Sequence, residues 1–456
     1  MLADVSPGTL AEARQPKLRR AIGPFQLTLY GLGSMLGSGI YGMIGQAAGL
    51  AGNLVWLSFI VAMVAALLTA LSYASLGSRY PRAGGAAYVT HRAFKMPLLS
   101  FVVGLAVVAS GVTSIATQSQ VFAVNLISIT GLTVVPVWAI AIGFLLIVAG
   151  IVLRGIKESM WFNVICTLIE AAGLLLVIAV GIPYWGSVDL LQPPLTTSGS
   201  DALLVLIFQG SVLTFFAFIG FEDILNVAEE CHEPEKTIPL ALVTAMMVGA
   251  LIYVAVAVTS VSVLPWKELA AAPGPLTEVM RRAAPSIPVV VFAAITLFAV
   301  ANTALVNFVT SSRMIYGMAD QKLLPQSLSK VSVGLKSPYV ATLSILLLLI
   351  PLAFFGSIAE LASASVLMLL VVFFIVNSAL LVLQRRSSEP KGKFEVPRLV
   401  PMLGAIVCLL LIGIRVSSAD WQAPALASGM LSCIVAIYFV RSKVTEFRSE
   451  RRTALI

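Results

Sequence analysis

Carboxyl groups interrupt two of the apolar stretches of this sequence. Glu222 and Asp223 follow Gly220 in a stretch that begins near Leu203, and Glu170 lies in the middle of another. A charged group at the centre of a membrane helix costs about 2.5–3.5 kcal/mol on insertion scales, so it faces a polar interior, finds a partner or holds a proton. These residues therefore indicate proton or cation chemistry inside a membrane.

A further stretch is interrupted by glycine. Residues 25–49 hold seven glycines, including Gly37 and Gly39 on either side of Ser38. Glycine costs about 1 kcal/mol relative to alanine within a helix, and serine competes for backbone hydrogen bonds, so the helix is expected to break there. The second half would then present free N–H groups and a partial positive charge to a carboxylate. The alternative for Gly33 and Gly37 is a G-x-x-x-G packing face.

The break at Gly220 has the opposite polarity, because its span crosses in the opposite direction. The first half would end near Phe218 and Ile219 with unpaired carbonyls, which suit an ammonium group. Beside a carboxylate site, this arrangement suits the zwitterionic part of an α-amino acid. Two glycine-broken spans in corresponding halves indicate a transporter's binding site. The neighbouring side chains of Phe215, Phe216 and Phe218 either wall the pocket or pack in the core or against lipid.

Composition places the whole chain in a membrane. Hydrophobic residues make up 59% and charged residues 11%, and the mean hydropathy is +0.99, far outside the range of soluble domains. At about 20 residues per crossing, the apolar runs predict an all-α polytopic protein with twelve transmembrane helices. Their predicted limits are 25–49, 53–76, 97–125, 134–153, 160–181, 203–228, 240–263, 287–312, 338–355, 358–383, 399–416 and 421–440.

The basic residues set the orientation. With the N-terminus inside, 25 of the 29 Lys and Arg residues fall on the cytoplasmic side, as the positive-inside rule requires. We therefore expect a multi-pass protein of the cell membrane with cytoplasmic tails at 1–22 and 441–456. The basic residues are spread over loops that face anionic lipid, and they form no stripe suited to nucleic acid.

The predicted loops are too short to contain a separate domain, so the function is expected within the bilayer. The sequence has no P-loop, nucleophile elbow or helical zinc motif, and this argues against an enzyme and against ATP-driven transport. His91 and His232 lie in predicted loops without a second ligand at metal spacing. Neither a metal nor a cofactor is predicted.

Four segments resemble signatures of the amino acid–polyamine–organocation superfamily of transporters. The resemblance is carried by LGSGIYG (36–42) and FFAFIGFEDILNVAEECHEPEKTIP (215–239) for helices 1 and 6, RYPRAGGAAYVTHRAF (79–94) for the loop after helix 2, and SSRMIYGMADQKLLP (311–325) for the end of helix 8.

This resemblance implies the leucine-transporter-type fold. Helices 1–5 (about 25–181) and 6–10 (about 203–383) would form inverted repeats in a transport core at 23–383. Helices 11 and 12 would lie peripherally at 384–440.

The resemblance also implies roles for particular residues. The backbone N–H groups of Ser38 and Gly39 would bind the substrate carboxylate, assisted by the Ser38 hydroxyl, and Gly37 would belong to the same substrate-binding segment. Phe216 matches an aromatic residue that covers the substrate in related arginine and agmatine exchangers. The amino group would meet the carbonyls of Met35, Phe216, Ala217 and Ile219.

Two carboxyl groups are candidates for ion coupling. Glu222 matches an acidic position implicated in proton-dependent transport; the alternative is that Glu222 and Asp223 cap the second half of helix 6. Glu170 departs from the pattern, because relatives commonly carry there a lysine that stands in for a sodium ion. Its alternative is a neutral glutamic acid bonded to a neighbouring helix, for example to Asn302, Thr303 or Ser311.

The sequence thus predicts a secondary active transporter of amino acids or related amines that works by alternating access and is coupled to protons. Sodium, bound near Thr310 and Ser311 of helix 8, is the alternative coupling ion. An uncoupled amino acid exchanger and a polyamine permease are the alternative functions. A channel or receptor is disfavoured, because it would require a pore lining or a ligand-binding ectodomain.

Overall fold

The computed structural model describes residues 18–131, 134–192, 200–272, 274–353, 359–417 and 422–453. Some side chains in these ranges, that of Ser38 among them, lie outside the description. Apart from one isolated bridge between Ile22 and Cys231, the regular structure of these ranges is helical.

Each of the twelve predicted spans coincides with a helix or with a pair of helices. Eight described spans are long and apolar enough to cross a membrane, and three shorter apolar helices lie in the C-terminal third of the chain. The chain is therefore an all-α polytopic membrane protein, as predicted. The spans are α2 (Pro24–Leu36) with α3 (Ser38–Ala51), α4 (Val55–Arg79), α6 (Pro97–Thr130), α7 (Val137–Arg154), α8 (Ile156–Gly181), α9 (Ser200–Phe215) with α10 (Asp223–Asn226), α11 (Pro234–Val263), α14 (Val289–Asp320), α15 (Tyr339–Leu352), α16 (Ala359–Arg385), α17 (Leu399–Ser417) and α18 (Gln422–Thr453).

Helices extend beyond the predicted limits in several places. The helix α18 continues to Thr453, where the sequence predicts a tail from 441 onward. Lys, Arg and Glu form helices as readily as most apolar residues, so a helix need not end where the apolar run ends. Three short helices, α5 (Gly85–Phe94), α12 (Trp266–Ala271) and α13 (Pro275–Ala283), occupy predicted loops. The division into a core at 23–383 and a peripheral part at 384–440 stays a prediction.

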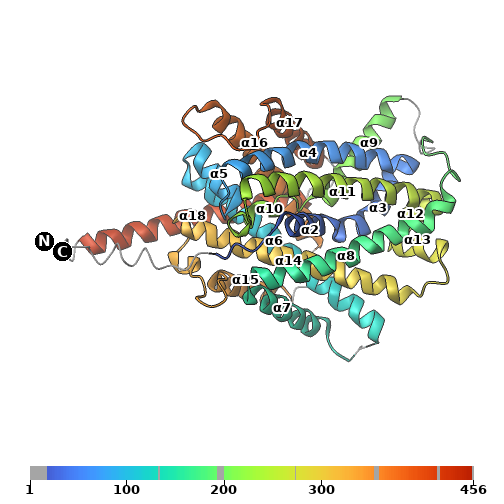
Figure 1. Ribbon diagram of the computed structural model, residues 1–456, viewed down its shortest axis with the longest axis horizontal. Helices are drawn as coiled ribbons and strands as arrows, with labels where there is room; N and C mark the ends of the chain where they lie inside the picture. Colours follow the sequence, from blue (N-terminus) through green and yellow to red (C-terminus); the bar gives the residue numbers. More distant parts are fainter. Residues whose placement is uncertain are drawn as a thin grey trace.

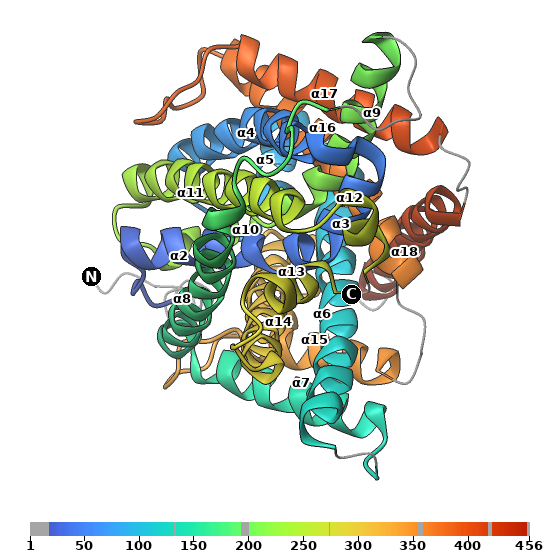
Figure 2. The ribbon, with the colours of Figure 1, turned by 90° about the vertical axis from the view of Figure 1, so that its right-hand side faces the viewer.

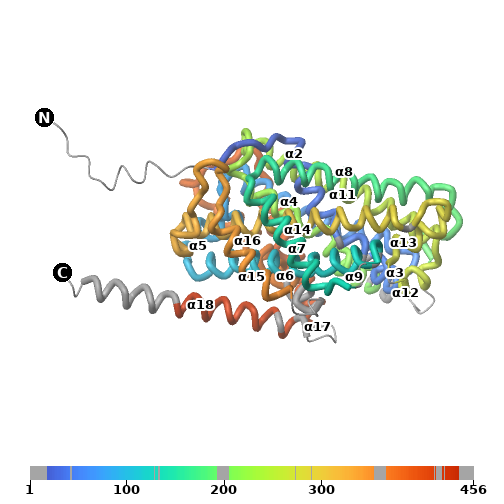
Figure 3. The backbone as a smooth tube through the Cα atoms, turned by 90° about the horizontal axis from the view of Figure 1, so that it is seen from below, coloured from blue at the N-terminus to red at the C-terminus, as the bar shows by residue number. Residues whose placement is uncertain are grey.

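The long helices run along one axis of the molecule, with α5 at one end and α12 and α13 at the other (Figure 1). In the end-on view, α3 lies within the bundle and α2 reaches its edge beside α8 and α11, while α17 and α18 lie at its margin (Figures 2 and 3). The helix α2 packs against α8, α11 and α14, and α3 packs against α9. Helices α6 and α14 form another closely packed pair. The first interrupted span is therefore held by helices from both halves of the sequence.

Both predicted helix breaks are present. Gly37 separates α2 from α3 with ψ −156°, which no helix contains. In the second span, α9 gives way to the 3₁₀ turn η3 (Phe216–Phe218), and Gly220 follows with φ +122°, a conformation that favours glycine. The continuation, α10, has four residues and is followed by η4 (Ala228–Glu230). It is shorter than the half-helix that the sequence predicts. Both α2 and α3 contact η3, so the two breaks face each other.

Candidate functional site

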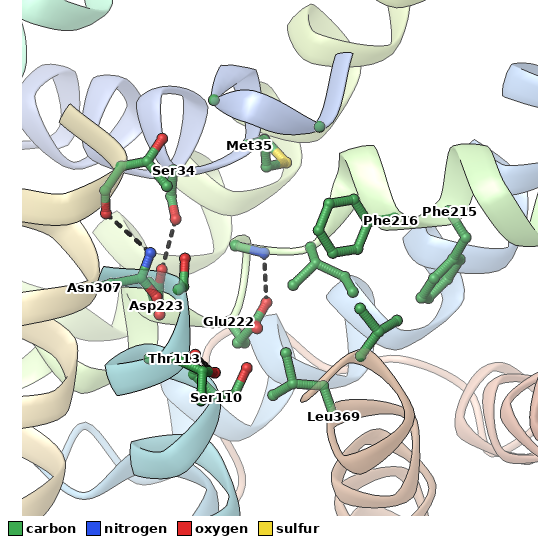
Figure 4. A pocket seen from close by; sticks show the side chains of 18 of the residues that line it. Ser34, Met35, Ser110, Thr113, Phe215, Phe216, Glu222, Asp223, Asn307 and Leu369 are labelled. Atoms are coloured by element: carbon green, nitrogen blue, oxygen red, sulfur yellow. Dashed lines mark hydrogen bonds between the residues drawn. The ribbon is translucent and has the colours of Figure 1, made fainter. Parts of the chain in front are cut away.

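A cavity of about 670 Å³ lies where the two breaks meet α6, α14 and α16. One part of its wall is apolar and includes Phe215, Phe216 and Leu369, whereas Asp223 and Asn307 lie on the opposite side (Figure 4). The helices α6 and α14 each turn a polar face toward the cavity. These faces include Ser110, Thr113 and Ser114 from α6 and Thr303, Asn307 and Thr310 from α14.

The first break supplies the N-terminal end of α3 to this cavity. Gly37 and Gly39 line it, and the first N–H groups of α3 have no partner within the helix. A Cβ atom at Gly39 would lie 2.8 Å from the Cα atom of Ala217, so the two breaks approach each other backbone to backbone. Ser38 begins α3, but its predicted hydroxyl contact lies outside the described side chains.

Gly33 and Gly37 also fit the alternative interpretation, in which they form a helix-packing face. A Cβ atom at Gly33 would lie 2.0 Å from Thr167 Oγ1, and one at Gly37 would lie 2.1 Å from Thr303 Oγ1. Both glycines therefore allow close packing of α2 on its neighbours, whereas only Gly37 also lines the cavity.

Tyr253 of α11 joins the two breaks from outside the cavity. Its hydroxyl group contacts the carbonyl oxygen of Met35 at 2.5 Å and that of Ala217 at 2.9 Å, and one phenol proton serves both acceptors. Of the four predicted ammonium acceptors, Met35, Phe216 and Ile219 line the cavity and Ala217 does not. Sequence reasoning missed this tyrosine, whose one signal is a polar group in an apolar helix.

The three phenylalanines of the second break have different surroundings. Phe215 and Phe216 line the cavity. Phe218 is fully buried, and its ring packs against that of Tyr253 at a centroid distance of 5.1 Å. The wall interpretation therefore fits the first two, and core packing fits the third.

Two carboxyl groups lie in the cavity wall, both almost fully buried. Glu222 Oε2 accepts a hydrogen bond from the Gly220 N–H group at 2.8 Å. Asp223 Oδ2 accepts one from Ser34 Oγ at 2.5 Å. Glu222 occupies the N-cap position of α10, yet its side chain makes no cap hydrogen bond. No hydrogen bond therefore supports the capping interpretation for Glu222. The described lining contains no Lys, Arg or His side chain.

Glu170 lies apart from the cavity, fully buried in α8. The Asn302 amide of α14 donates to Glu170 Oε2 at 3.3 Å and to Thr167 Oγ1 at 2.9 Å. This is one of the helix 8 partners that the sequence offers for a neutral glutamic acid. Thr167 in turn donates to the Leu29 carbonyl of α2 at 3.3 Å. Glu170 Oε1 and Asn163 Oδ1 have no hydrogen-bond partner in the described structure.

The hydroxyl groups proposed for a sodium ion face different helices. Thr310 Oγ1 lies 3.1 Å from Tyr30 Oη on α2. A Cβ atom at Gly111 would lie 2.2 Å from Ser311 Oγ, so Ser311 lies against α6. The alternative sodium site stays a prediction.

Comparison with known proteins identifies the family. The family described as amino acid permease matches residues 22–439. The chain belongs to the amino acid permease family. This places it in the amino acid–polyamine–organocation superfamily that the sequence motifs indicate, and it makes the chain a membrane transporter and not an enzyme.

Individual relatives extend over most of the chain. An uncharacterized transporter of Mycobacterium tuberculosis is 32% identical over 442 residues, covering 96% of this chain and 94% of its own. The branched-chain amino acid permease of Bacillus subtilis is 28% identical, covering 88% of this chain and 89% of its own. The human cationic amino acid transporter 4 is 29% identical, covering 82% and 61%.

Proposed function

We propose that this permease is a secondary active transporter that carries amino acids across the cell membrane by alternating access. The observation that supports this most strongly is the pair of broken spans of opposite polarity at one cavity. The N-terminal end of α3 offers N–H groups and a partial positive charge, whereas the end of α9 offers carbonyl groups. Relatives named for branched-chain and for cationic amino acids support the same substrate class.

In this proposal the zwitterionic part of the substrate lies between the breaks. Its carboxylate binds the N–H groups at Gly37, Ser38 and Gly39. Its ammonium group binds the carbonyls of Met35, Phe216 and Ile219, the three of the four expected acceptors that line the cavity. The Met35 carbonyl already accepts the Tyr253 hydroxyl and the Phe216 carbonyl the Ile219 N–H group, and the second lone pair of each oxygen can still accept the ammonium. The aromatic ring of Phe216 covers the bound substrate.

The coupling ion in this proposal is a proton, and Glu170 or Glu222 carries it. The two groups differ in position: Glu222 lines the cavity and meets the substrate directly, whereas Glu170 is sealed between α2, α8 and α14. A protonated carboxyl is neutral and also donates a hydrogen bond, so it suits a buried site whose acceptor atoms lack partners. Both termini are cytoplasmic in this proposal.

A polyamine or amine permease is the second candidate. It is favoured by the two carboxyl groups in the cavity wall and by the lack of a basic side chain among the described lining residues. Such a protein would bind a second ammonium group where an amino acid transporter binds a carboxylate. Substrate analogues separate the two functions, as the Discussion describes.

The test is uptake into proteoliposomes with and without an inward proton gradient. The substrate is the amino acid that gives the largest thermal shift in a screen of amino acids and common amines, because ligand binding stabilises the folded state. One proton moving with a neutral zwitterion carries one charge, so membrane potential adds about 2.3 kcal/mol per 100 mV.

Glu170→Gln or Glu222→Gln should abolish gradient-driven accumulation and keep downhill exchange. Glu278→Gln on α13, which alters a partly exposed carboxyl group outside the cavity, is the matched control and should behave as wild type. Wild-type accumulation that ignores the pH gradient would instead support an uncoupled exchanger or sodium coupling.

A further inference from the structure

An ion pair without solvent contact lies just beyond the cavity, on the side that bears the N-terminal segment. Arg313 Nε donates to Glu230 Oε2 at 3.0 Å and Nη2 donates to Oε1 at 3.2 Å, and both side chains have 0% exposure. The third nitrogen, Nη1, donates to Ser312 Oγ at 3.1 Å. A bidentate pair of this kind is geometrically specific, yet it seldom adds net stability over apolar packing. Its presence therefore calls for a role other than stability.

The pair joins a broken span to an unbroken helix. Glu230 ends η4, which follows the short α10 of the second broken span, whereas Arg313 belongs to α14. The cavity lining reaches Thr310 on α14, and Arg313 follows one turn later. The lining likewise includes Asp223 at the start of α10. The pair thus lies one helical turn below the floor of the cavity.

Backbone hydrogen bonds also connect the segment before α2 to the backbone at Glu230. The N–H groups of Ala21 and Ile22, just before α2, donate to the Glu230 carbonyl at 2.8 and 3.0 Å. The His232 N–H group donates back to the Ile22 carbonyl at 2.9 Å. Both broken spans are therefore tied together beside Glu230.

The loop before α5 also packs against the elements around Glu230, on the same side of the cavity. Glu229 Oε1 accepts a hydrogen bond from the Ala83 N–H group at 3.1 Å. A Cβ atom at Gly317 on α14 would lie 2.4 Å from the Gly84 backbone nitrogen, so backbones touch directly there. The helices α10 and α5 lie toward the same end of the bundle (Figure 1).

We infer that the Glu230–Arg313 ion pair is the latch that closes the cavity toward the N-terminal side, and that transport requires it to open and re-form. The inference rests on the proposed alternating access. Separating α10 and η4 from α14 breaks this pair, and water then reaches both charges. Because an unpaired buried charge is strongly disfavoured, removing one partner shifts the protein toward the state in which this side is open.

The test measures how fast a cysteine in the cavity reacts from each side of the membrane. The parent protein carries Ser110→Cys in the lining, together with Cys433→Ser and Cys231→Ser, because Cys433 is exposed and Cys231 adjoins Glu230 and would become accessible when the ion pair opens. A charged, membrane-impermeant maleimide is added to sealed vesicles of either orientation. In the parent, the reaction from the N-terminal side should be slow.

Glu230→Gln should speed the reaction from the N-terminal side by about tenfold or more and slow it from the other side. Lys393→Gln is the control: it removes an exposed ion pair with Glu235 and should leave both rates unchanged. The double exchange Glu230→Arg with Arg313→Glu should return both rates to within about twofold of the parent.

A folded Glu230→Gln protein with parental rates would overturn the latch, as would a double exchange that fails to restore them. If Glu230→Gln does not fold, Arg313→Lys decides, because lysine keeps the charge and loses the bidentate geometry. It should give a smaller rise from the N-terminal side, because the charges stay paired but lose one of their two hydrogen bonds, and parental rates would overturn the latch. Alternating access is judged separately, by whether substrate changes the two rates of the parent in opposite directions.

Discussion

Replacing Gly39 with alanine tests the close approach of the two breaks. The added Cβ atom would lie 2.8 Å from Ala217 Cα and 3.4 Å from Ala217 Cβ. Carbon atoms in contact normally lie about 3.5–4.0 Å apart, so α3 and η3 must separate by roughly 0.7 Å. Overpacking of this kind costs about 1–3 kcal/mol.

We expect this cost to fall on substrate binding, because the displaced parts are the proposed carboxylate and ammonium sites. At about 1.4 kcal/mol per tenfold change, Gly39→Ala should weaken binding by roughly 5- to 150-fold. Gly39→Leu should abolish it while the folded protein still reaches the membrane. The assay is equilibrium binding of the thermal-shift hit to purified protein, with the melting temperature as a measure of folding.

Gly143→Ala on α7 is the matched control, because its new Cβ atom would meet no atom within 4 Å. The same chemical change there should leave binding unchanged and keep or slightly raise stability. Wild-type affinity in a well-folded Gly39→Ala protein would refute the reasoning, since it would mean that the substrate does not depend on this approach.

The remaining predictions concern Tyr253, the substrate carboxylate and Glu229. Tyr253→Phe leaves two buried carbonyls without their shared donor and should weaken binding about tenfold, measured with the same assay; unchanged binding and melting temperature would show that the bridge is dispensable. An amino acid with its carboxylate amidated should bind about 10- to 150-fold more weakly, through loss of a contact worth about 1.5–3 kcal/mol, and equal binding of acid and amide would favour an amine permease. Burial raises the pKa of Glu229, against the opposing hydrogen bond from Ala83, so its stabilising contribution is present below the ordinary carboxyl pKa and is lost as pH rises through the raised one. In melting curves from pH 4 to 8, Glu229→Gln should therefore gain stability relative to wild type as pH rises, and parallel curves would contradict this.

Much of the fold follows from the sequence because membrane insertion constrains local composition so strongly. The lengths of the apolar runs suffice to predict the twelve spans, and the glycines that interrupt two of them suffice to predict the breaks near Gly37 and Gly220. The positions of helix ends are predicted less well, since α18 extends into a segment with no apolar run. Hydrophobicity sets where a helix leaves the lipid, whereas helix propensity and capping set where the helix ends.

The candidate site divides in the same way. Backbone features such as the two breaks follow from local residue types, whereas contacts between distant helices do not. The Tyr253 bridge spans 218 positions to Met35, and the Asn302–Glu170 contact spans 132. Only the packing of α11 against the broken spans and of α14 against α8 brings these groups together. The short length of α10 could not be predicted from the local sequence either, because acidic residues such as Glu222 and Asp223 are also common at the start of longer helices.

The central claim, that this protein carries a zwitterionic amino acid through the cavity between the two breaks, is tested most directly by counterflow in proteoliposomes. Vesicles loaded with unlabelled substrate should take up the labelled thermal-shift hit in a saturable way, faster than empty vesicles, and Gly39→Leu should abolish this uptake while Gly143→Ala retains it. A flux that rises linearly with concentration, is indifferent to substrate inside the vesicle or survives Gly39→Leu unchanged would contradict the account.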